Sequence, residues 1–221
     1  MQKVVGLVGL RGSGKDTAAK FLMACGWRRI AFADALYLEV ATAFNVTVEF
    51  LQRRDTKESP LPELALANCQ DPLFVECFLA YEEKGRAQFV QDSVPREEQL
   101  RQPRSPREIL QVWGTEYRRV MFRDDYWREQ VHQVIAADPT TNFVITDVRF
   151  PDEARLVEQT LNGVLGRIRR PGLPGADDKA LMHSSEVAML EYPIEREFLN
   201  AEGESGMNQF RVAILAAFAF A

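Results

Sequence analysis

The chain has 221 residues, of which 46% are hydrophobic and 27% charged, a balance typical of a globular protein with a full core. Its formal net charge of −5 gives no overall basic excess of the kind that holds duplex nucleic acid. Two histidines exclude a His-rich metal site, and three cysteines without a C-x-x-C pair do not form a disulfide framework.

The first elements predict a strand, a glycine-rich loop and a helix. Residues 3–9 are apolar and β-branched, which predicts a buried strand, and residues 15–24 predict a helix with one apolar face. Residues 28–33 predict a second short strand. A helix over 34–44 follows, and Asp34 stands where an N-cap residue is expected.

The middle of the chain changes character at residue 45. Residues 45–104 contain several prolines, mixed charges and weak periodicity, so we interpret them as an insertion of short helices and loops. At Ser105 the sequence "SPRE" predicts a helix start, with Pro in the first turn and Glu108 completing a capping box. The helix should bury residues that recur every four positions, namely Ile109, Trp113, Tyr117 and Met121.

The second half alternates strands with helices. A helix is expected over 125–137, followed by an apolar strand that ends in Asp147 and by a helix over 151–161. A strand over 164–170 comes next. A short strand near 194–199 and a core-facing helix from about residue 205 complete the pattern. Such alternation predicts an α/β fold with a parallel sheet covered on both faces.

The loop after the first strand carries phosphate-binding chemistry. It fits the pattern G-x-x-x-x-G-K, although Asp16 stands where a Ser or Thr hydroxyl usually binds Mg²⁺. A carboxylate oxygen is also a ligand that Mg²⁺ accepts, and Thr17 can bond a phosphate. Lys15 supplies positive charge for the β- and γ-phosphates. Three glycines let the loop's N–H groups turn inward: Gly9, Gly12 and Gly14. The alternative is a glycine-rich turn with an exposed lysine.

Further candidates follow the later strands. Asp147 lies at a strand's carboxyl end, where it can hold Mg²⁺ or orient an acceptor phosphate, or instead cap a helix or form a salt bridge. Arg149 is a candidate phosphate clamp or a structural ion-pair partner. Arginines ahead of a Gly/Pro-rich segment can stabilise a transferring phosphoryl group or simply be solvated, namely Arg167, Arg169 and Arg170. By chemistry alone, the chain is a P-loop phosphotransferase or an NTPase.

The order of motifs adds a resemblance that covers about two-thirds of the chain and is weakest over 45–104. The motifs are "GSGKDT", "FADAL", "SPREILQVWGTEYRR", "DYW", "ITDVRFPDEA", "RRPG" and "HSSE". In this order they resemble the bacteriophage deoxynucleoside monophosphate kinases, a branch of the P-loop nucleoside monophosphate kinases. The resemblance implies transfer of the γ-phosphate of ATP, with Mg²⁺, to a deoxynucleoside 5′-monophosphate. It also implies that Asp16 is an accepted variant of the loop.

The resemblance also implies residue roles. The residues expected to bind ATP are Gly9, Arg11, Gly12, Ser13, Gly14, Lys15, Asp16, Thr17 and Asn200, the last near the adenine. Those expected to serve catalysis are Lys15, Asp147, Arg149, Arg169 and Arg170, with Asp16 and Asp147 near the metal. Those expected to bind the acceptor are Asp34, Arg54, Lys57, Thr115, Glu116, Arg149, His183 and Glu186. By residue type alone, His183 is equally a structural or surface histidine.

The same resemblance implies a P-loop kinase core over 1–44 and 105–221, an inserted acceptor-binding segment over 45–104 and a lid-like segment over 170–186. Structural padding or a homodimer contact is an equal alternative for 45–104. No apolar run reaches the roughly 18 residues of a membrane helix. With its unpaired cysteines, the chain is therefore expected in the cytoplasm, that of the host if phage-encoded.

Other functions stay open at this point. A kinase of the same fold could phosphorylate a hydroxymethylated base within phage DNA, which would require a local basic patch despite the net charge of −5. A P-loop ATPase switch would hydrolyse ATP without a monophosphate acceptor. A nucleotide-binding scaffold without turnover is disfavoured by Lys15 and the arginines.

Overall fold

The computed structural model describes residues 2–86, 94–173 and 189–219. The chain divides into two compact units, which we call the sheet unit (residues 1–32 and 128–221) and the helical unit (residues 33–127). Residues 33–44 and 105–127, which we expected in the kinase core, group by their contacts with the helical unit.

The sheet unit is built on five parallel strands in the order β2-β3-β1-β4-β5. The central strand β1 pairs with β3 on one side and β4 on the other, so that Val5 lies opposite both Val144 and Val164. The parallel sheet predicted from the sequence is therefore confirmed. The strands are β1 (Val4–Val8), β2 (Arg28–Ile30), β3 (Phe143–Ile145), β4 (Val164–Arg169) and β5 (Glu197–Leu199).

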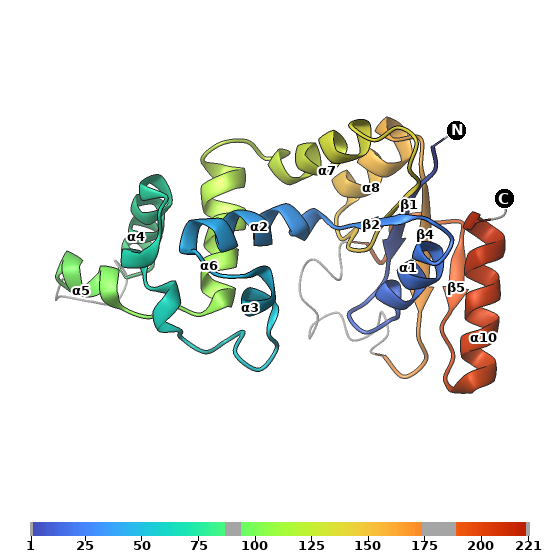
Figure 1. The fold of residues 1–221 in the computed structure, drawn as a ribbon, viewed down its shortest axis with the longest axis horizontal. Helices are drawn as coiled ribbons and strands as arrows, with labels where there is room; N and C mark the ends of the chain where they lie inside the picture. Colours follow the sequence, from blue (N-terminus) through green and yellow to red (C-terminus); the bar gives the residue numbers. More distant parts are fainter. Residues whose placement is uncertain (1, 87–93, 174–188, 220–221) are drawn as a thin grey trace. The chain divides into compact units, whose positions relative to one another are not determined.

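Helices cover both faces of this sheet (Figure 1). Side chains of β1 alternate between two cores, as expected for a strand buried on both sides. Val5 and Leu7 pack with α1 (Lys15–Met23) and α10 (Gly203–Ile214). Val4 and Val8 lie in the core formed with the C-terminal part of α7 (Tyr126–Ala136) and with α8 (Pro151–Arg155), which continues as a π-helical turn.

The C-terminal apolar stretch forms the core-facing helix that the sequence predicts. Helix α10 continues as a π-helical segment to Ala219, and its buried face carries Phe210, Ile214 and Phe218. Within the parts of the chain that the structure describes, no helix is both long and apolar enough to cross a membrane.

The helical unit has a core of its own, centred on Phe74. Its ring lies 4.4 Å from Trp113, 5.6 Å from Tyr117, 5.7 Å from Phe78 and 6.2 Å from Phe44, measured between ring centroids. The elements around it are α2 (Phe32–Phe44), α3 (Val48–Gln52), α4 (Pro72–Arg86), α5 (Arg96–Arg101), α6 (Pro106–Val112) and two short 3₁₀ turns (Pro62–Leu64 and Leu66–Asn68). Helix α6 continues as a π-helix over Trp113–Val120, which we call the π segment.

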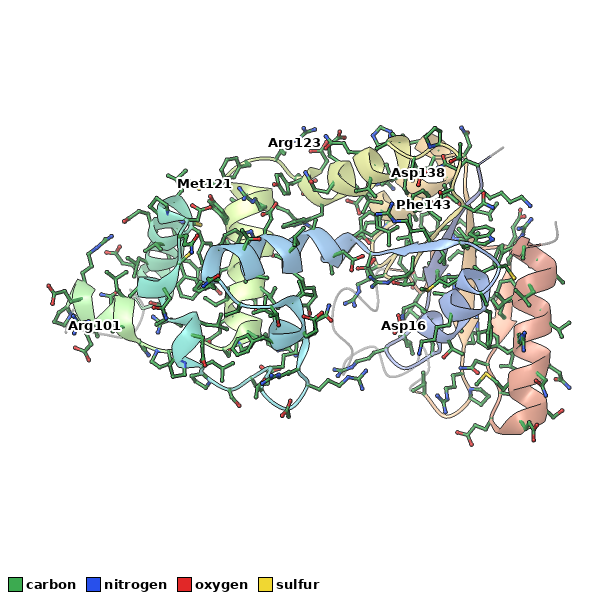
Figure 2. The ribbon with its side chains drawn as sticks, in the orientation of Figure 1. Asp16, Arg101, Met121, Arg123, Asp138 and Phe143 are labelled. Carbon is green, nitrogen blue, oxygen red and sulfur yellow. The ribbon has the colours of Figure 1, made fainter. Side chains whose placement is uncertain are left out.

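Several local predictions can be checked in this unit. The capping box is confirmed, because Ser105 Oγ accepts the N–H of Glu108 and the Glu108 carboxylate accepts the N–H of Ser105. Met121 is 53% exposed, so its predicted burial is wrong (Figure 2). The π segment has wider turns than an α-helix, which breaks the four-residue spacing beyond Tyr117. Helix α4 is longer than the short helices expected over 45–104.

The start of α2 also differs from the prediction. The helix begins at Phe32, so Asp34 lies inside the first turn and is not the N-cap. The N–H of Phe32 instead donates to Oδ1 of Asp147 at 2.8 Å. A carboxylate 115 residues away along the chain satisfies an N–H that no residue within the helix can satisfy.

Candidate active site

The loop between β1 and α1 has the backbone that a phosphate cradle requires. Gly9, Gly12 and Gly14 adopt φ values of 150°, 82° and 109°, a region that side chains disfavour. Lys15 and Asp16 then open α1, whose N-terminus adds a partial positive charge facing the loop (Figure 2).

Two of these glycines are also required by space. A Cβ at Gly9 would lie 2.5 Å from the carbonyl oxygen of Ile168 and 2.7 Å from Ser13 Oγ. A Cβ at Gly14 would lie 2.3 Å from Nδ2 of Asn200. The loop is therefore packed tightly against the ends of the neighbouring strands, with its backbone in a defined shape.

The polar groups of the loop fit a phosphate ligand. The Lys15 ammonium donates to the carbonyl oxygens of Gly9 and Leu10 at 2.6 and 2.9 Å, so it lies over the loop itself. Ser13 is 1% exposed, and its Oγ has no hydrogen-bond partner among the residues that the structure describes. A buried hydroxyl without a partner is costly unless a ligand supplies one. The donor set of the loop thus suits the phosphates of a nucleotide.

Asn200 is hydrogen-bonded to this loop. It follows β5, is 4% exposed, and donates from Nδ2 to the carbonyl oxygen of Ser13 at 2.8 Å. Its own N–H donates to the carbonyl oxygen of Arg169 at 2.8 Å. Asn200, predicted to lie near the adenine, therefore contacts the phosphate loop directly and joins it to the end of β4.

Asp147 stands at the carboxyl end of β3, where the sequence placed it. It is partly buried, and its bond to the N–H of Phe32 matches the helix-cap alternative for this residue. The predicted roles in catalysis and metal binding stay predictions.

A buried glutamate follows on the same segment. Glu153 is buried, and its Oε2 accepts the N–H groups of Arg149 and Phe150 at 2.7 and 3.2 Å. Sequence reasoning missed Glu153, although Pro151 followed by Glu153 repeats the pattern of the capping box at 105–108. Glu153 therefore fixes the backbone from which the Arg149 side chain projects.

The predicted arginine clamps are exposed. The side chain of Arg149 makes no hydrogen bond or ion pair within the described ranges. Arg169 pairs with Glu197 at 2.8 Å, and Arg170 with Glu202 at 3.7 Å. Exposed pairs of this kind contribute roughly 0–1 kcal/mol, so a phosphate can replace the glutamate at little cost.

Arg167 differs from its two neighbours. Its side chain is 13% exposed and donates to the carbonyl oxygens of Met189, Leu190 and Tyr192 at 2.9, 3.2 and 2.7 Å. Burial lowers the pKa of Arg167, and Glu197 partly opposes this effect. Arg167 is thus a structural residue that holds the chain at 189–192, rather than the solvated side chain we considered.

One carboxylate at the start of α1, that of Asp16, is of the type that could ligate Mg²⁺. Asp16 is exposed in the first turn of α1. Among the described residues, no three His, Cys, Asp or Glu side chains form a metal-binding group. Mg²⁺ in phosphoryl-transfer sites commonly uses one or two carboxylates together with substrate phosphates. Asp16 therefore fits such a site with the phosphates supplying the other ligands.

Five of the acceptor candidates lie on three segments of the helical unit, whereas Arg149 belongs to the sheet unit. Asp34 is in the first turn of α2. Arg54 is exposed and Lys57 half-buried in the loop after α3. Thr115 is exposed and Glu116 half-buried on the π segment. His183 and Glu186, with most of the lid-like segment 170–186, lie outside the described residues.

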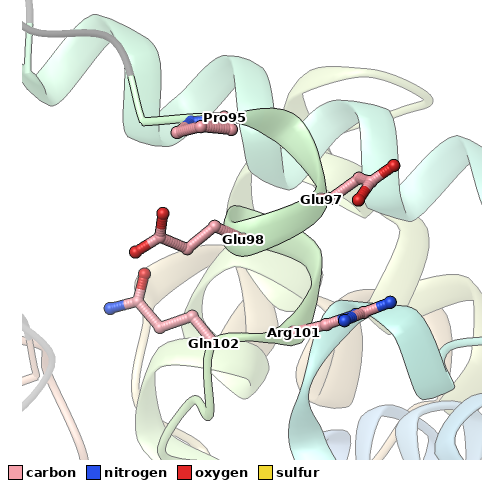
Figure 3. A pocket seen from close by; sticks show the side chains of 5 residues that line it. All are labelled: Pro95, Glu97, Glu98, Arg101 and Gln102. Carbon is pink, nitrogen blue, oxygen red and sulfur yellow. The ribbon is translucent and has the colours of Figure 1, made fainter.

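A pocket beside α5 contains none of the predicted site residues. Figure 3 shows its lining, which includes two glutamates and one arginine on a six-residue helix. The lining residues are Pro95, Glu97, Glu98, Arg101 and Gln102. This pocket adds nothing to the phosphate loop or to the acceptor candidates.

Comparison with known proteins gives two curated relatives, and no family model matches the chain. A deoxynucleoside-5′-monophosphate kinase of Escherichia phage T5 is 32% identical over an alignment of 190 positions, which covers 72% of this chain and 73% of the phage protein. A protein of Acanthamoeba polyphaga mimivirus, provisionally named a deoxynucleotide monophosphate kinase, is 26% identical over 199 positions. This alignment covers 84% of this chain and 81% of the viral protein. Among solved structures, a dephospho-CoA kinase from Campylobacter jejuni aligns with a TM-score of 0.46 at 13% identity, covering 98% of this chain and 96% of that one.

Proposed function

Because this chain belongs to the family of deoxynucleoside-5′-monophosphate kinases and is a nucleotide kinase, we propose that it phosphorylates a deoxynucleoside 5′-monophosphate with ATP. The products are ADP and a deoxynucleoside diphosphate. The observation that supports ATP as donor is the glycine cradle. At the N-terminus of α1 it holds the Lys15 ammonium and a buried Ser13 hydroxyl that has no hydrogen-bond partner within residues 2–86, 94–173 and 189–219.

In this proposal the reaction needs alignment and positive charge more than proton transfer. An oxygen of the acceptor phosphate forms a bond to the γ-phosphorus, and the bond between that phosphorus and the β–γ bridging oxygen breaks. A phosphate dianion is already a competent nucleophile, so no dedicated general base is required. Mg²⁺ bound beside Asp16 would neutralise charge on the phosphate oxygens.

Different residues of the chain would bind the donor phosphates, stabilise the transferring phosphoryl group and orient the acceptor. Lys15, the N–H groups of the loop and the α1 N-terminus hold the β- and γ-phosphates of ATP. Arg149, Arg169 and Arg170 supply positive charge around the moving phosphoryl group, because their present contacts with solvent or exposed glutamates are easily exchanged. Asp147 orients the acceptor phosphate or the metal.

The helical unit is the proposed source of acceptor contacts. The side chains of this unit that we assign to the role are Asp34, Arg54, Lys57, Thr115 and Glu116. They would act together with Arg149 of the sheet unit and with His183 and Glu186, which lie outside the described residues. A pocket that hydrogen-bonds one polar base edge rejects other bases strongly, so a few of these residues would set the base preference. The proposed location is the cytoplasm of the cell in which the protein is made.

The test is product formation by the purified chain with ATP, Mg²⁺ and each deoxynucleoside monophosphate in turn, separated by chromatography. Diphosphate formed together with ADP would support the proposal and give the base preference. ADP without diphosphate would indicate an ATPase and contradict it. If neither product forms, the assay repeated with hydroxymethylated DNA would test the DNA-base kinase.

A further inference from the structure

One carboxylate in the helical unit accepts hydrogen bonds from three neighbouring side chains. Glu39, in the middle of α2, accepts from Nε1 of Trp113 at 2.8 Å and from Nε of Arg118 at 2.7 Å on its Oε2. Its Oε1 accepts from the hydroxyl of Tyr126 at 2.6 Å. The Glu39 side chain is only 22% exposed, so these three bonds replace most of its hydration.

The cation that pairs with Glu39 is itself confined by aromatic rings. Cζ of Arg118 lies 4.5 Å from the ring centroid of Tyr117 and 5.1 Å from those of Phe122 and Tyr126. Such a guanidinium has few alternative positions, because its faces are covered by rings and its Nε is bonded to the carboxylate. Glu39 and Arg118 therefore fix the distance between α2 and the π segment.

The two acceptor candidates of the π segment lie, in sequence, between two residues that donate hydrogen bonds to Glu39. Thr115 and Glu116 lie between Trp113 and Arg118, the two residues that Glu39 holds. The intervening Gly114 is held as well, since its carbonyl oxygen accepts from Nε1 of Trp127 at 3.0 Å. A Cβ at Gly114 would lie 3.3 Å from the Leu36 side chain, so α2 and the π segment approach closely at this point.

We propose that Glu39 is a positioning residue for the acceptor monophosphate. It contacts no substrate in this proposal; it sets the spacing between Asp34 on α2 and Thr115 and Glu116 on the π segment. π-Helical turns in proteins are frequently found at functional sites, and this one is hydrogen-bonded to the partly buried carboxylate of Glu39. The inference rests on the proposed function, because it assigns these three residues to the acceptor.

The test is steady-state kinetics of the full chain carrying Glu39→Gln. The amide keeps the size of the side chain and one acceptor oxygen, but it loses the charge that pairs with Arg118. We expect the KM for the preferred monophosphate to rise by about tenfold, because displaced acceptor residues would lose the equivalent of one hydrogen bond to the charged monophosphate. The KM for ATP should change by less than about twofold, since the phosphate loop is built by other residues.

Glu82→Gln is the matched control. Glu82 lies in the same unit with a similar exposure of 19%, and it pairs at 2.8 Å with Arg104, which is 2% exposed. Arg104 also donates to the carbonyl oxygen of Gln102 at 3.2 Å, so this pair ties α4 to the chain before α6 and not α2 to the π segment. Both variants should lose thermal stability, but Glu82→Gln should leave the KM for the monophosphate unchanged. Tyr126→Phe removes one bond to Glu39 and should raise the same KM by a smaller factor, even if Glu39→Gln fails to fold.

The outcomes separate the two proposals. If the wild-type chain forms no diphosphate, the proposed function and this inference both fall. If the wild type is active and the KM for the monophosphate is unchanged in Glu39→Gln, or in Tyr126→Phe where Glu39→Gln does not fold, only the positioning role falls. Parallel rises in both KM values, matched by Glu82→Gln, would show a general loss of structure and would also overturn it.

Discussion

At the scale of single residues, Lys15 is the most direct test of the phosphate loop. Lys15→Ala should lower turnover at least ~10²-fold, as expected for removing one preorganised charge from a transferring phosphate. Diphosphate formation at saturating substrates measures it. Lys20→Ala, an exposed lysine in the last turn of the same helix, is the control and should remain active. Near-normal turnover in a folded Lys15→Ala protein would refute the assignment of the loop.

Asp147 allows its two roles to be separated. Asp147→Asn keeps an oxygen for the N–H of Phe32, so its thermal stability should match the wild type. Asp147→Ala leaves that N–H without its cap and should lose about 0.5–2 kcal/mol of stability. If the charge serves the reaction, Asp147→Asn should be stable and at least about tenfold slower, the lower end of losses at such groups. A stable Asp147→Asn variant with full activity would refute a role of the charge in the reaction, and Asp147 would then serve only as the cap of α2.

The sequence reveals loop residues better than distant partners. Glycines and a lysine at fixed spacing specify a local backbone, so Gly9, Gly14 and Lys15 could be predicted. The hydrogen bond between Asp147 and Phe32 joins residues that are 115 positions apart, and no local sequence pattern in either segment predicts its partner. The same limit applies to Asn200, whose contact with Ser13 spans 187 residues.

At the scale of elements, the helix that opens at Ser105 depends on its cap. Ser105→Ala removes the side-chain oxygen that accepts the N–H of Glu108 and should cost about 1 kcal/mol. Denaturant unfolding measures the loss. Ser59→Ala, at an exposed serine of the same unit, is the control. Equal stabilities of the two variants would contradict a contribution from the capping box.

The contact between α2 and the start of α7 should respond to alkaline pH. Burial first, and then the bond to Glu39, raise the pKa of Tyr126 from its ordinary 10.0 to about 12. The folded protein therefore keeps a proton that the unfolded chain releases. The contribution of Tyr126 to the free energy of unfolding is complete below pH 10 and is lost between pH 10 and about 12. Unfolding free energies across this range measure the slope. Tyr126→Phe should reduce it, and an unchanged slope would contradict the assignment.

Some elements could be predicted and others could not, for physical reasons. The strands β1 and β3 are continuous apolar runs that are buried along their whole length, as expected for central parallel strands covered on two faces. Helix α4 lies within a segment of mixed charge, and its length depends on burying Phe74 and Phe78 in a core assembled from distant residues. The sequence of the π segment has the apolar pattern of an α-helix, so the sequence alone does not predict the π-helix. In the structure, the exposure of Met121 shows that the four-residue repeat of buried positions ends at Tyr117.

At the scale of the whole molecule, the packing of the helical unit and that of the sheet unit can be probed separately. Phe74→Ala removes the ring at the centre of the helical unit and should cost about 3–5 kcal/mol there. The tryptophans report on each unit, because Trp27 lies in the sheet unit and Trp113 and Trp127 in the helical unit. With Trp27→Phe in the background, fluorescence follows the helical unit; with Trp113 and Trp127 replaced by Phe, it follows the sheet unit.

Phe74→Ala should lower the unfolding midpoint reported by Trp113 and Trp127 more than that reported by Trp27. A Phe210→Ala variant, in the core of the sheet unit, should do the reverse. Identical shifts of the unfolding midpoint at all three tryptophans for both variants would contradict separate packing of the two units.

The path of the chain through the two units has a consequence for its synthesis. The helical unit is one continuous stretch that ends at residue 127, whereas β1 pairs with β3 and β4, which end at Ile145 and Arg169. A ribosome therefore completes the helical unit before it makes either neighbour of β1. Pairing across such a distance is slow, and domains generally fold as units while the chain emerges. Strand β1 (Val4–Val8) is apolar throughout, and the chain must be synthesised further before both of its neighbours exist than for any other strand of this sheet.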